Sequence, residues 1–308
     1  MDNLTHSLVG AVLGQSGLKR LSGLGLPTLI IAANIPDIDA GCTVYGVESL
    51  AMRRGLTHGP IAMIVLPALL TAAMIALDRL QAQRRTRPAD RPEVKPGALF
   101  LLALIGTLSH TAFDWLNNYG IRLLEPFSSR WFYGDAIFII DLWLWVAMGA
   151  AVWLSRRRER RGQGSWRRPA QAAIGAVTLY VSFNIALSWQ VEMQASAQLA
   201  RNGVSPTLVV ASPLPILFWR RDIFWRDGRQ MGLGHYDLFS GLALPAGGAP
   251  LRMDDPRIAK AASARADVTA FLFWARMPFA VRKGSGLSIN DQRFDNPVTR
   301  DRFTVQID

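Results

Sequence analysis

The chain has 308 residues, half of them apolar, and a formal net charge of +11 at pH 7. In a soluble protein this combination usually indicates nucleic-acid binding, but most arginines of the first half lie in two short blocks, residues 79–95 and 156–168, each between long apolar segments. These blocks resemble loops at a membrane surface, with a patch that binds DNA or anionic lipid as the rival interpretation. The single cysteine excludes a disulfide framework.

Composition divides the chain near residue 190. The first part is dominated by apolar runs, whereas the remainder mixes charges, prolines and aromatic residues as a water-soluble domain does. We therefore expect a mainly α protein in two domains. Residues 1–190 form a polytopic transmembrane helical bundle, and residues 191–308 form a small extramembrane domain of mixed or mostly β structure.

In chain order, the apolar segments 4–18 and 24–35 are too short for comfortable spans, so re-entrant, tilted or packed helices are expected. Four later segments are long enough to cross a bilayer as helices of about 20 residues: residues 59–77, 97–116, 136–154 and 170–189. In the second domain, short apolar runs at 208–210, 216–219 and 268–274 predict strands or a short helix.

The positive-inside rule gives this bundle an orientation. With both basic blocks in the cytoplasm, the polar residues at the ends of the apolar segments collect at the outer face. The second domain then also lies outside, which in a bacterium is the periplasmic side of the inner membrane. Charge placement and ligand identity are separate observations, so their agreement supports one site at one face.

The candidate ligands are histidines and carboxylates where apolar segments meet polar turns. His110 and Asp114 are four residues apart, so a helix presents both side chains on one face. His58 stands before a Gly-Pro helix start, and Pro36 ends an apolar run just before an Asp-Ile-Asp turn. Mixed histidine and carboxylate ligands suit zinc or another divalent transition metal. The predicted ligands are His6, Asp37, His58, His110 and Asp114.

Each of these residues also has a plainer interpretation. The His110 and Asp114 pair is also explained by an ordinary helix-surface hydrogen bond, and Asp37 by a turn cap. A lone His58 is more often interfacial, and a lone His6 is more often a core residue. Placed near membrane segments as a group, however, ionisable side chains call for a functional explanation.

Neighbouring polar residues complete the predicted site. Arg53 and Arg54 are predicted to bind a phosphate or another anionic group, because guanidinium forks match such oxygens; contact with lipid headgroups is the equal alternative. Asn117 and Asn118 are predicted to orient Asp114, or else to cap the helix end.

Three other polar residues receive weaker assignments. Asp135 lies in a turn. Asp141 lies inside an apolar run and so requires a partner. His235 is expected at the surface of the second domain.

The motifs Asn-Leu-Thr-His, Pro-Asp-Ile-Asp, Arg-Gly-Leu-Thr-His-Gly and His-x-x-x-Asp-x-x-Asn occur in this order. Together they resemble the membrane-bound metal-dependent hydrolase family described as LexA-regulated. More distantly, that family is similar to zinc-dependent phospholipases C and related nucleases. The resemblance implies one ion held by four residues: Asp37, His58, His110 and Asp114. It also implies a second ion, held by His6 and Asp39 together with Asp114. No histidine lies between His110 and His235, so a complete three-metal cluster is not expected.

The expected activity is metal-assisted hydrolysis with one or two divalent ions, zinc first and manganese second. Whichever of Asp37 and Asp39 does not bind metal is the predicted general base. Headgroup depth and the family resemblance point to a phosphoester in a membrane lipid or lipid-linked substrate, and no nucleic-acid partner is expected. The alternative is a non-catalytic membrane scaffold or partner-binding protein with a structural metal. A transporter ranks third, because the acidic groups cluster at one depth.

Overall fold

The computed structural model describes residues 1–296 and 299–307, and the chain divides into two compact units. The first comprises Met1–Ile38 and Arg54–Asn184, and the second Asp39–Arg53 and Ile185–Asp308. Residues 39–53 thus group with the second unit although they lie early in the sequence. The boundary falls inside one long helix, α7, a few residues before the position where composition changes.

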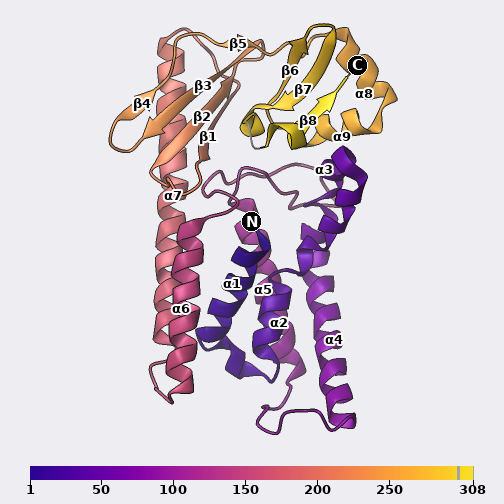
Figure 1. The fold of residues 1–308 in the computed structure, drawn as a ribbon, viewed down its shortest axis with the longest axis vertical. Helices are drawn as coiled ribbons and strands as arrows, with labels where there is room; N and C mark the ends of the chain where they lie inside the picture. The colour runs from indigo at the N-terminus through magenta and orange to yellow at the C-terminus, as the bar shows by residue number, and fades with distance from the viewer. Residues whose placement is uncertain (297–298, 308) are drawn as a thin grey trace. The chain divides into compact units, whose positions relative to one another are not determined.

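The first unit is helical (Figure 1). Its α-helices are α1 (Asn3–Gln15), α2 (Gly25–Ala32), α4 (Ala62–Gln83), α5 (Pro96–Trp115), α6 (Leu142–Arg160) and the first part of α7 (Arg168–Arg201). The short 3-10 helices η1 (Leu18–Leu21) and η3 (Leu56–His58) belong to it as well, and η2 (Ile35–Glu48) begins in it. As expected, α1 and α2 are too short to cross a bilayer as straight helices.

Within the described residues, three helices are long and apolar enough to cross a membrane: α4, α5 and α7. The third predicted span, residues 136–154, is wrong. Residues 136–141 form a connection in which the N–H groups of Ala136 and Ile137 both donate to the Leu116 carbonyl. Asp141 then caps α6 by accepting from Leu144 N at 3.0 Å, so the helix starts late and ends among arginines.

Close helix contacts hold α1 and α5 against α2. A Cβ atom on Gly10 of α1 would lie 2.7 Å from the Leu29 carbonyl oxygen. A Cβ atom on Gly106 of α5 would lie 2.6 Å from the Ala32 Cβ. Only glycine permits such close backbone approach. The three helices therefore pack at a short separation, which fixes the end of α2 beside the last turns of α5.

Polar contacts tie α6 and α7 to this group. Trp145 of α6 donates from its indole N–H to Thr5 Oγ1 at 2.9 Å, and Tyr180 of α7 donates to Asp141 Oδ2 at 2.8 Å. Asp141 thus has the partner that its position in an apolar run requires. Large apolar side chains remain exposed on the outer helix faces, including Leu69 of α4, Leu101 of α5, Val146 of α6 and Leu179 of α7, as lipid-facing residues are.

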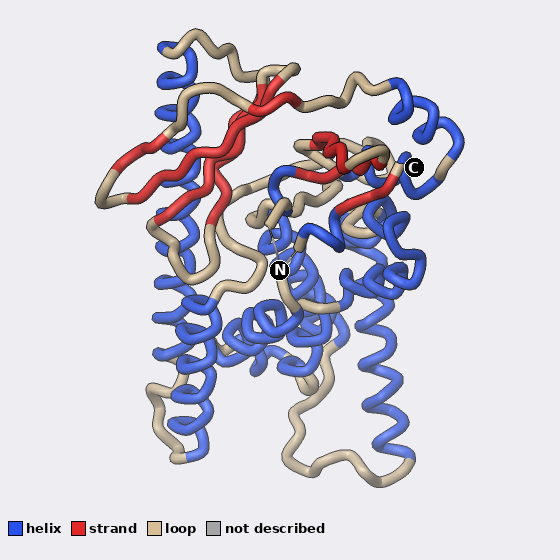
Figure 2. The backbone as a smooth tube through the Cα atoms, turned by 45° about the horizontal axis from the view of Figure 1, so that its top comes forward, coloured by secondary structure: helices blue, strands red, loops and turns tan. Residues whose placement is uncertain are grey.

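The second unit contains two antiparallel sheets (Figure 2). The first has the order β1-β2-β3-β4, with β5 also paired to β3. The second has the order β6-β7-β8. Their strands are β1 (Leu208–Pro213), β2 (Arg220–Arg226), β3 (Gln230–Asp237), β4 (Gly241–Ala243), β5 (Ala249–Pro250), β6 (Pro278–Lys283), β7 (Gly286–Asp291) and β8 (Thr304–Gln306). The helices are α3 (Ser49–Met52), α8 (Pro256–Ala264), α9 (Ala266–Trp274), η4 (Gln292–Phe294) and η5 (Arg300–Phe303), with the second part of α7.

Each sheet has an apolar core of its own. The first packs on α7 through Val191 and Ala195, which meet Ile223 of β2. Beside the second sheet, Trp274 of α9 stacks with Phe303 at a centroid distance of 5.0 Å. The expectation of a mixed domain is met. Of the apolar runs, 208–210 lies in β1 and 268–274 in α9, whereas 216–219 precedes β2 as a turn.

A buried ion pair stabilises the second sheet. Asp291 at the end of β7 accepts from Arg293 Nε and NH2, both at 2.9 Å, and both side chains are fully buried. Burial alone would raise the pKa of Asp291. The Arg293 guanidinium and the backbone N–H groups that donate to the carboxylate instead hold its pKa below the ordinary value.

Candidate metal centre

The last turns of α5 supply two donors. His110 and Asp114 lie one turn apart on the buried face of the helix and are at most 1 % exposed. The close approach at Gly106 brings the end of α2 within reach, so His110 Nδ1 lies 2.8 Å from the Ala33 carbonyl oxygen. A carbonyl only accepts, so we assign the imidazole proton to Nδ1. In the neutral ring, Nε2 then carries a free lone pair, which is the arrangement found in histidine ligands.

His58, the last residue of η3, supplies a third donor. The next residue, Gly59, packs closely against the backbone of Glu125, because a Cβ atom there would lie 2.0 Å from the Glu125 carbonyl oxygen. Thr57 Oγ1 lies 2.8 Å from His58 Nδ1 and so helps to orient the ring. His58 Nε2 then faces His110 Nε2 at 3.1 Å and Asp114 Oδ2 at 3.4 Å.

Asp37 completes the group from the turn after α2. Pro36 follows the end of that helix, and the Asp37 backbone N–H donates to the Asn34 carbonyl at 3.1 Å. Its Oδ1 atom is buried, has no hydrogen-bond partner among the described residues, and lies 3.8 Å from His110 Nε2. A buried carboxylate oxygen in this state costs free energy unless a cation satisfies it.

The four donor atoms have the spacing of a metal site. The ligand atoms of Asp37, His58, His110 and Asp114 all lie within 4.8 Å of one another. Bond lengths of about 2.1 Å to a tetrahedral zinc ion put neighbouring donors about 3.4 Å apart. Asp114 Oδ2 is 3.4 Å from His58 Nε2 and 3.6 Å from His110 Nε2, close to that value. The residues therefore fit a divalent metal ion.

Arg54 contacts both oxygens of the Asp114 carboxylate. Its Nε lies 3.0 Å from Asp114 Oδ2, and its NH2 donates to Asp114 Oδ1 at 3.2 Å. Its NH1 donates to Asn117 Oδ1 at 3.0 Å, and the guanidinium lies 4.7 Å from the ring centroid of Tyr119. Arg54 is only 4 % exposed. The Arg54 guanidinium thus makes its contacts inside the protein. It links Asn117 to Asp114, because it contacts both side chains.

His6 of α1 lies beside the four-donor group. Its Nε2 is 3.2 Å from Asp114 Oδ1, the carboxylate oxygen away from the other histidines. Its ring stacks on His110 with the centroids 3.8 Å apart. The Met1 α-amine also contacts Asp114 Oδ1. His6 therefore shares Asp114 with the group, and its Nδ1 has no hydrogen-bond partner within the described structure.

The remaining predicted residues lie in different surroundings. Asn118 is buried, like Asn117. Asp39 and Arg53 belong to the second unit, so their roles stay predictions from the sequence. Asp135 is buried in the α5–α6 connection. The His235 side chain is 63 % exposed and pairs with Asp222, so its surface assignment is confirmed.

Sequence reasoning missed the interior role of Arg54 and the carbonyl that orients His110. The spacing of residues in the sequence gave no signal for either feature. In the structure, Arg54 has a left-handed backbone conformation, φ 54°, which marks a position that tertiary contacts impose.

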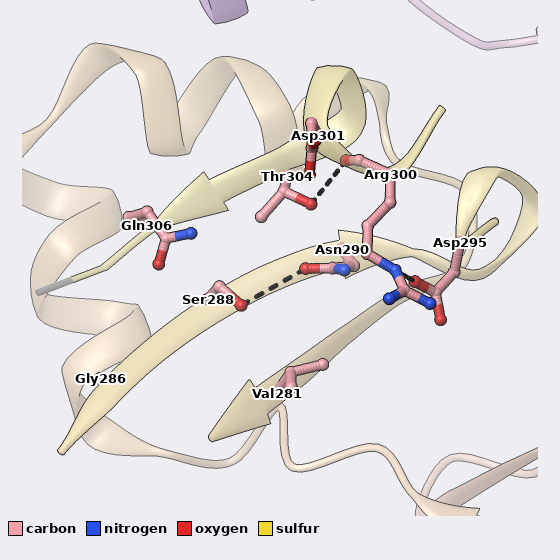
Figure 3. A pocket seen from close by; sticks show the side chains of 9 residues that line it. All are labelled: Val281, Gly286, Ser288, Asn290, Asp295, Arg300, Asp301, Thr304 and Gln306. Carbon is pink, nitrogen blue, oxygen red and sulfur yellow. Dashed lines mark hydrogen bonds and ion pairs between the residues drawn. The ribbon is translucent and has the colours of Figure 1, made fainter. Parts of the chain in front are cut away.

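The second unit also has a pocket, of about 340 Å³, on the β6-β7-β8 sheet (Figure 3). Ser288, Asn290 and Thr304 point into it, and an ion pair between Arg300 and Asp295 lies at its rim. Thr304 Oγ1 donates to the Arg300 carbonyl at 2.7 Å. Its polar groups thus partly satisfy one another, and no predicted site residue lines it.

Comparison with known proteins identifies the helical part. A sequence model described as YdjM inner membrane protein matches residues 1–191, which is more than half of the chain. The chain therefore belongs to the YdjM inner membrane protein family. No curated protein and no solved structure matches it. The match covers every donor of the four-residue group and both connections that carry the basic blocks.

Proposed function

We propose that this member of the YdjM inner membrane protein family is a metal-dependent hydrolase that acts on a phosphoester in a lipid or lipid-linked substrate. The observation that carries the proposal is the group of four donor atoms, two imidazole nitrogens and two carboxylate oxygens, within 4.8 Å of one another. Such ligands suit zinc, with manganese as the second choice. Either ion, when bound, lowers the pKa of a water ligand and polarises a phosphoryl oxygen.

The protein's own groups have separate tasks in this proposal. His58, His110 and Asp114 would hold the ion, and the contact between His110 and the Ala33 carbonyl leaves the Nε2 lone pair of His110 available to it. Arg54 is a positioning residue, because both of its contacts with the Asp114 carboxylate fix the oxygen that faces the histidines. A phosphate-binding role for Arg54 would require it to exchange these contacts for substrate.

Proton transfer is assigned to an aspartate. Asp37 belongs to the donor group, so Asp39 is the proposed general base, with Asp37 as the base if it leaves the ion during the reaction. His6 is proposed to hold a second ion together with Asp114 Oδ1, from which it lies 3.2 Å. Arg53 is the proposed contact for the anionic part of the substrate.

A lipid substrate is supported by the position of the donors in the first unit. His110 and Asp114 lie in the last turns of a helix long enough to span, and apolar side chains are exposed along it. From this we infer a site at headgroup depth. With the basic connections in the cytoplasm, we propose that the site and the second unit's domain lie on the periplasmic side of a polytopic bundle.

A structural metal is the second candidate function. His58, His110 and Asp114 are at most 1 % exposed, and four protein ligands without an open position are typical of structural zinc. In that case the ion would tie α2 and η3 to α5, and the protein would act as a scaffold or bind a partner. Metal removal distinguishes the two candidate functions: it should abolish hydrolysis if the metal is catalytic, and it should lower the melting temperature of a protein without hydrolytic activity if the metal is structural.

The test is hydrolysis by the full-length protein in detergent, before and after chelation and with zinc or manganese restored. The probes are bis(p-nitrophenyl) phosphate and short-chain phosphatidylglycerol. We expect activity that disappears on chelation, returns with metal and is lost in Asp37→Asn, while His235→Ala behaves as wild type. Metal that binds stoichiometrically without any hydrolysis of either phosphodiester, and whose removal lowers the melting temperature, would favour the structural candidate.

A further inference from the structure

A second feature of the first unit is a groove along α6. Residues of α6 recur every three or four positions along one face, and Arg161 directly after the helix continues it: Gly149, Val152, Trp153, Arg156, Arg157 and Arg160. With Leu8 of α1 they line a groove of about 600 Å³. Its first half is apolar and its second half basic. Ligand sites commonly have volumes in this range.

The basic half of the groove lies toward the opposite end of the helices from the metal centre. Trp145, near the start of α6, contacts α1 at Thr5, beside His6. Arg160 is 15 residues later, which is about 22 Å along a helix. The same end holds the α4–α5 and α6–α7 connections, both drawn at the bottom of Figure 1. The arginines of the groove are therefore separate from the proposed hydrolytic site.

The positive charge of the groove has no internal compensation. Residues 149–168 contain one acidic residue, Glu159, and it bonds Lys19 Nζ at 2.5 Å. Within the described chain, no carboxylate pairs with any of the four arginines that line the groove. Their side chains are exposed, and Arg157 lies 5.2 Å from the ring centroid of Trp153. Three more cations, Lys19, Arg20 and Arg167, surround the nearby Trp166 ring.

We infer that this groove is a binding site for an anionic phospholipid. The apolar half beside Gly149 and Leu8 suits the upper part of an acyl chain, and the arginines suit the phosphate. Trp153, 58 % exposed, lies between them as aromatic residues do at membrane interfaces. Basic pockets between helices on the cytoplasmic side are suited to anionic headgroups, and each basic residue near such a surface contributes about five-fold in binding.

The test is native mass spectrometry of the full-length protein with equal amounts of phosphatidylglycerol and phosphatidylcholine of the same chain length. We expect retention of phosphatidylglycerol over phosphatidylcholine by at least about ten-fold. The triple variant Arg156→Gln/Arg157→Gln/Arg160→Gln should lose this preference. The matched control is Arg79→Gln/Arg84→Gln/Arg85→Gln, which removes three exposed arginines from the other basic block and should keep it.

A single Arg157→Gln variant should lose about five-fold, which keeps the test informative if the triple variant does not fold. Equal retention of the two lipids by the wild type would overturn the proposal. So would equal losses in the two triple variants, because the effect would then belong to general surface charge. Full displacement of the lipid by inorganic phosphate would show that the arginines bind a free anion, and would overturn it too.

Discussion

The ion pair between Arg54 and Asp114 offers a sharp test of how the donor group is supported. Asp114→Asn keeps the shape of the side chain but removes the charge that both contacts of Arg54 depend on, at 3.0 and 3.2 Å. The Arg54 side chain is 5 % exposed, so its charge would remain buried without the Asp114 carboxylate. Breaking a buried pair by removing one partner costs about 3–5 kcal/mol. At about 2–4 °C per kcal/mol for a chain of this size, the melting temperature should fall by roughly 6 °C or more.

The assay is thermal unfolding in detergent with a chelator present, so that metal loss does not contribute to the difference. The control is Glu159→Gln, which removes a partly exposed partner of Lys19 and should cost no more than about 1 kcal/mol. The double variant Arg54→Met/Asp114→Asn should be less destabilised than the sum of the two single changes. A melting temperature for Asp114→Asn no lower than that of the control would refute the buried pair.

Three further changes test the surroundings of the donors and of the second sheet. Gly106→Val should force α5 away from α2 and lower metal retention by displacing His110, whereas Gly97→Ala, on open surface of the same helix, should not; elemental analysis distinguishes them. Asn117→Ala removes the acceptor that holds the buried guanidinium, and isothermal titration should show roughly ten-fold weaker metal binding. Because the pKa of Asp291 is lowered on folding, the stabilisation from this carboxylate is present above about pH 4 and is lost as the pH falls. Asp291→Asn should therefore flatten the acid side of the curve of unfolding free energy against pH. An unchanged curve would contradict this.

The helical part and the donor types were predictable because both are local properties of the sequence. A spacing of four residues puts His110 and Asp114 on one helix face whatever surrounds them, and the length of an apolar run sets whether a helix can span. Pro36 predicted the end of α2 for the same reason. His58 joined the prediction because it too lies where an apolar segment meets a polar turn, and its Nε2 lies 3.1 Å from that of His110.

Features that depend on tertiary contacts were not predictable. Hydropathy extended the third span back to residue 136, because it does not register that the backbone there bonds to Leu116 or that Asp141 caps a later helix start. The grouping of residues 39–53 with the second unit is equally non-local. Arg54 was interpreted as a substrate contact because sequence shows its charge and not its partner, which lies 60 residues away.

The most direct test of the central claim, a metal centre formed by Asp37, His58, His110 and Asp114, is elemental analysis of the detergent-purified protein under conditions that exclude metal from the affinity tag. We predict one or two equivalents of zinc or manganese in the wild type and in His235→Ala, and loss of metal in His110→Ala and Asp114→Ala. Folded wild-type protein without metal, or variants that keep the full metal content, would contradict the account.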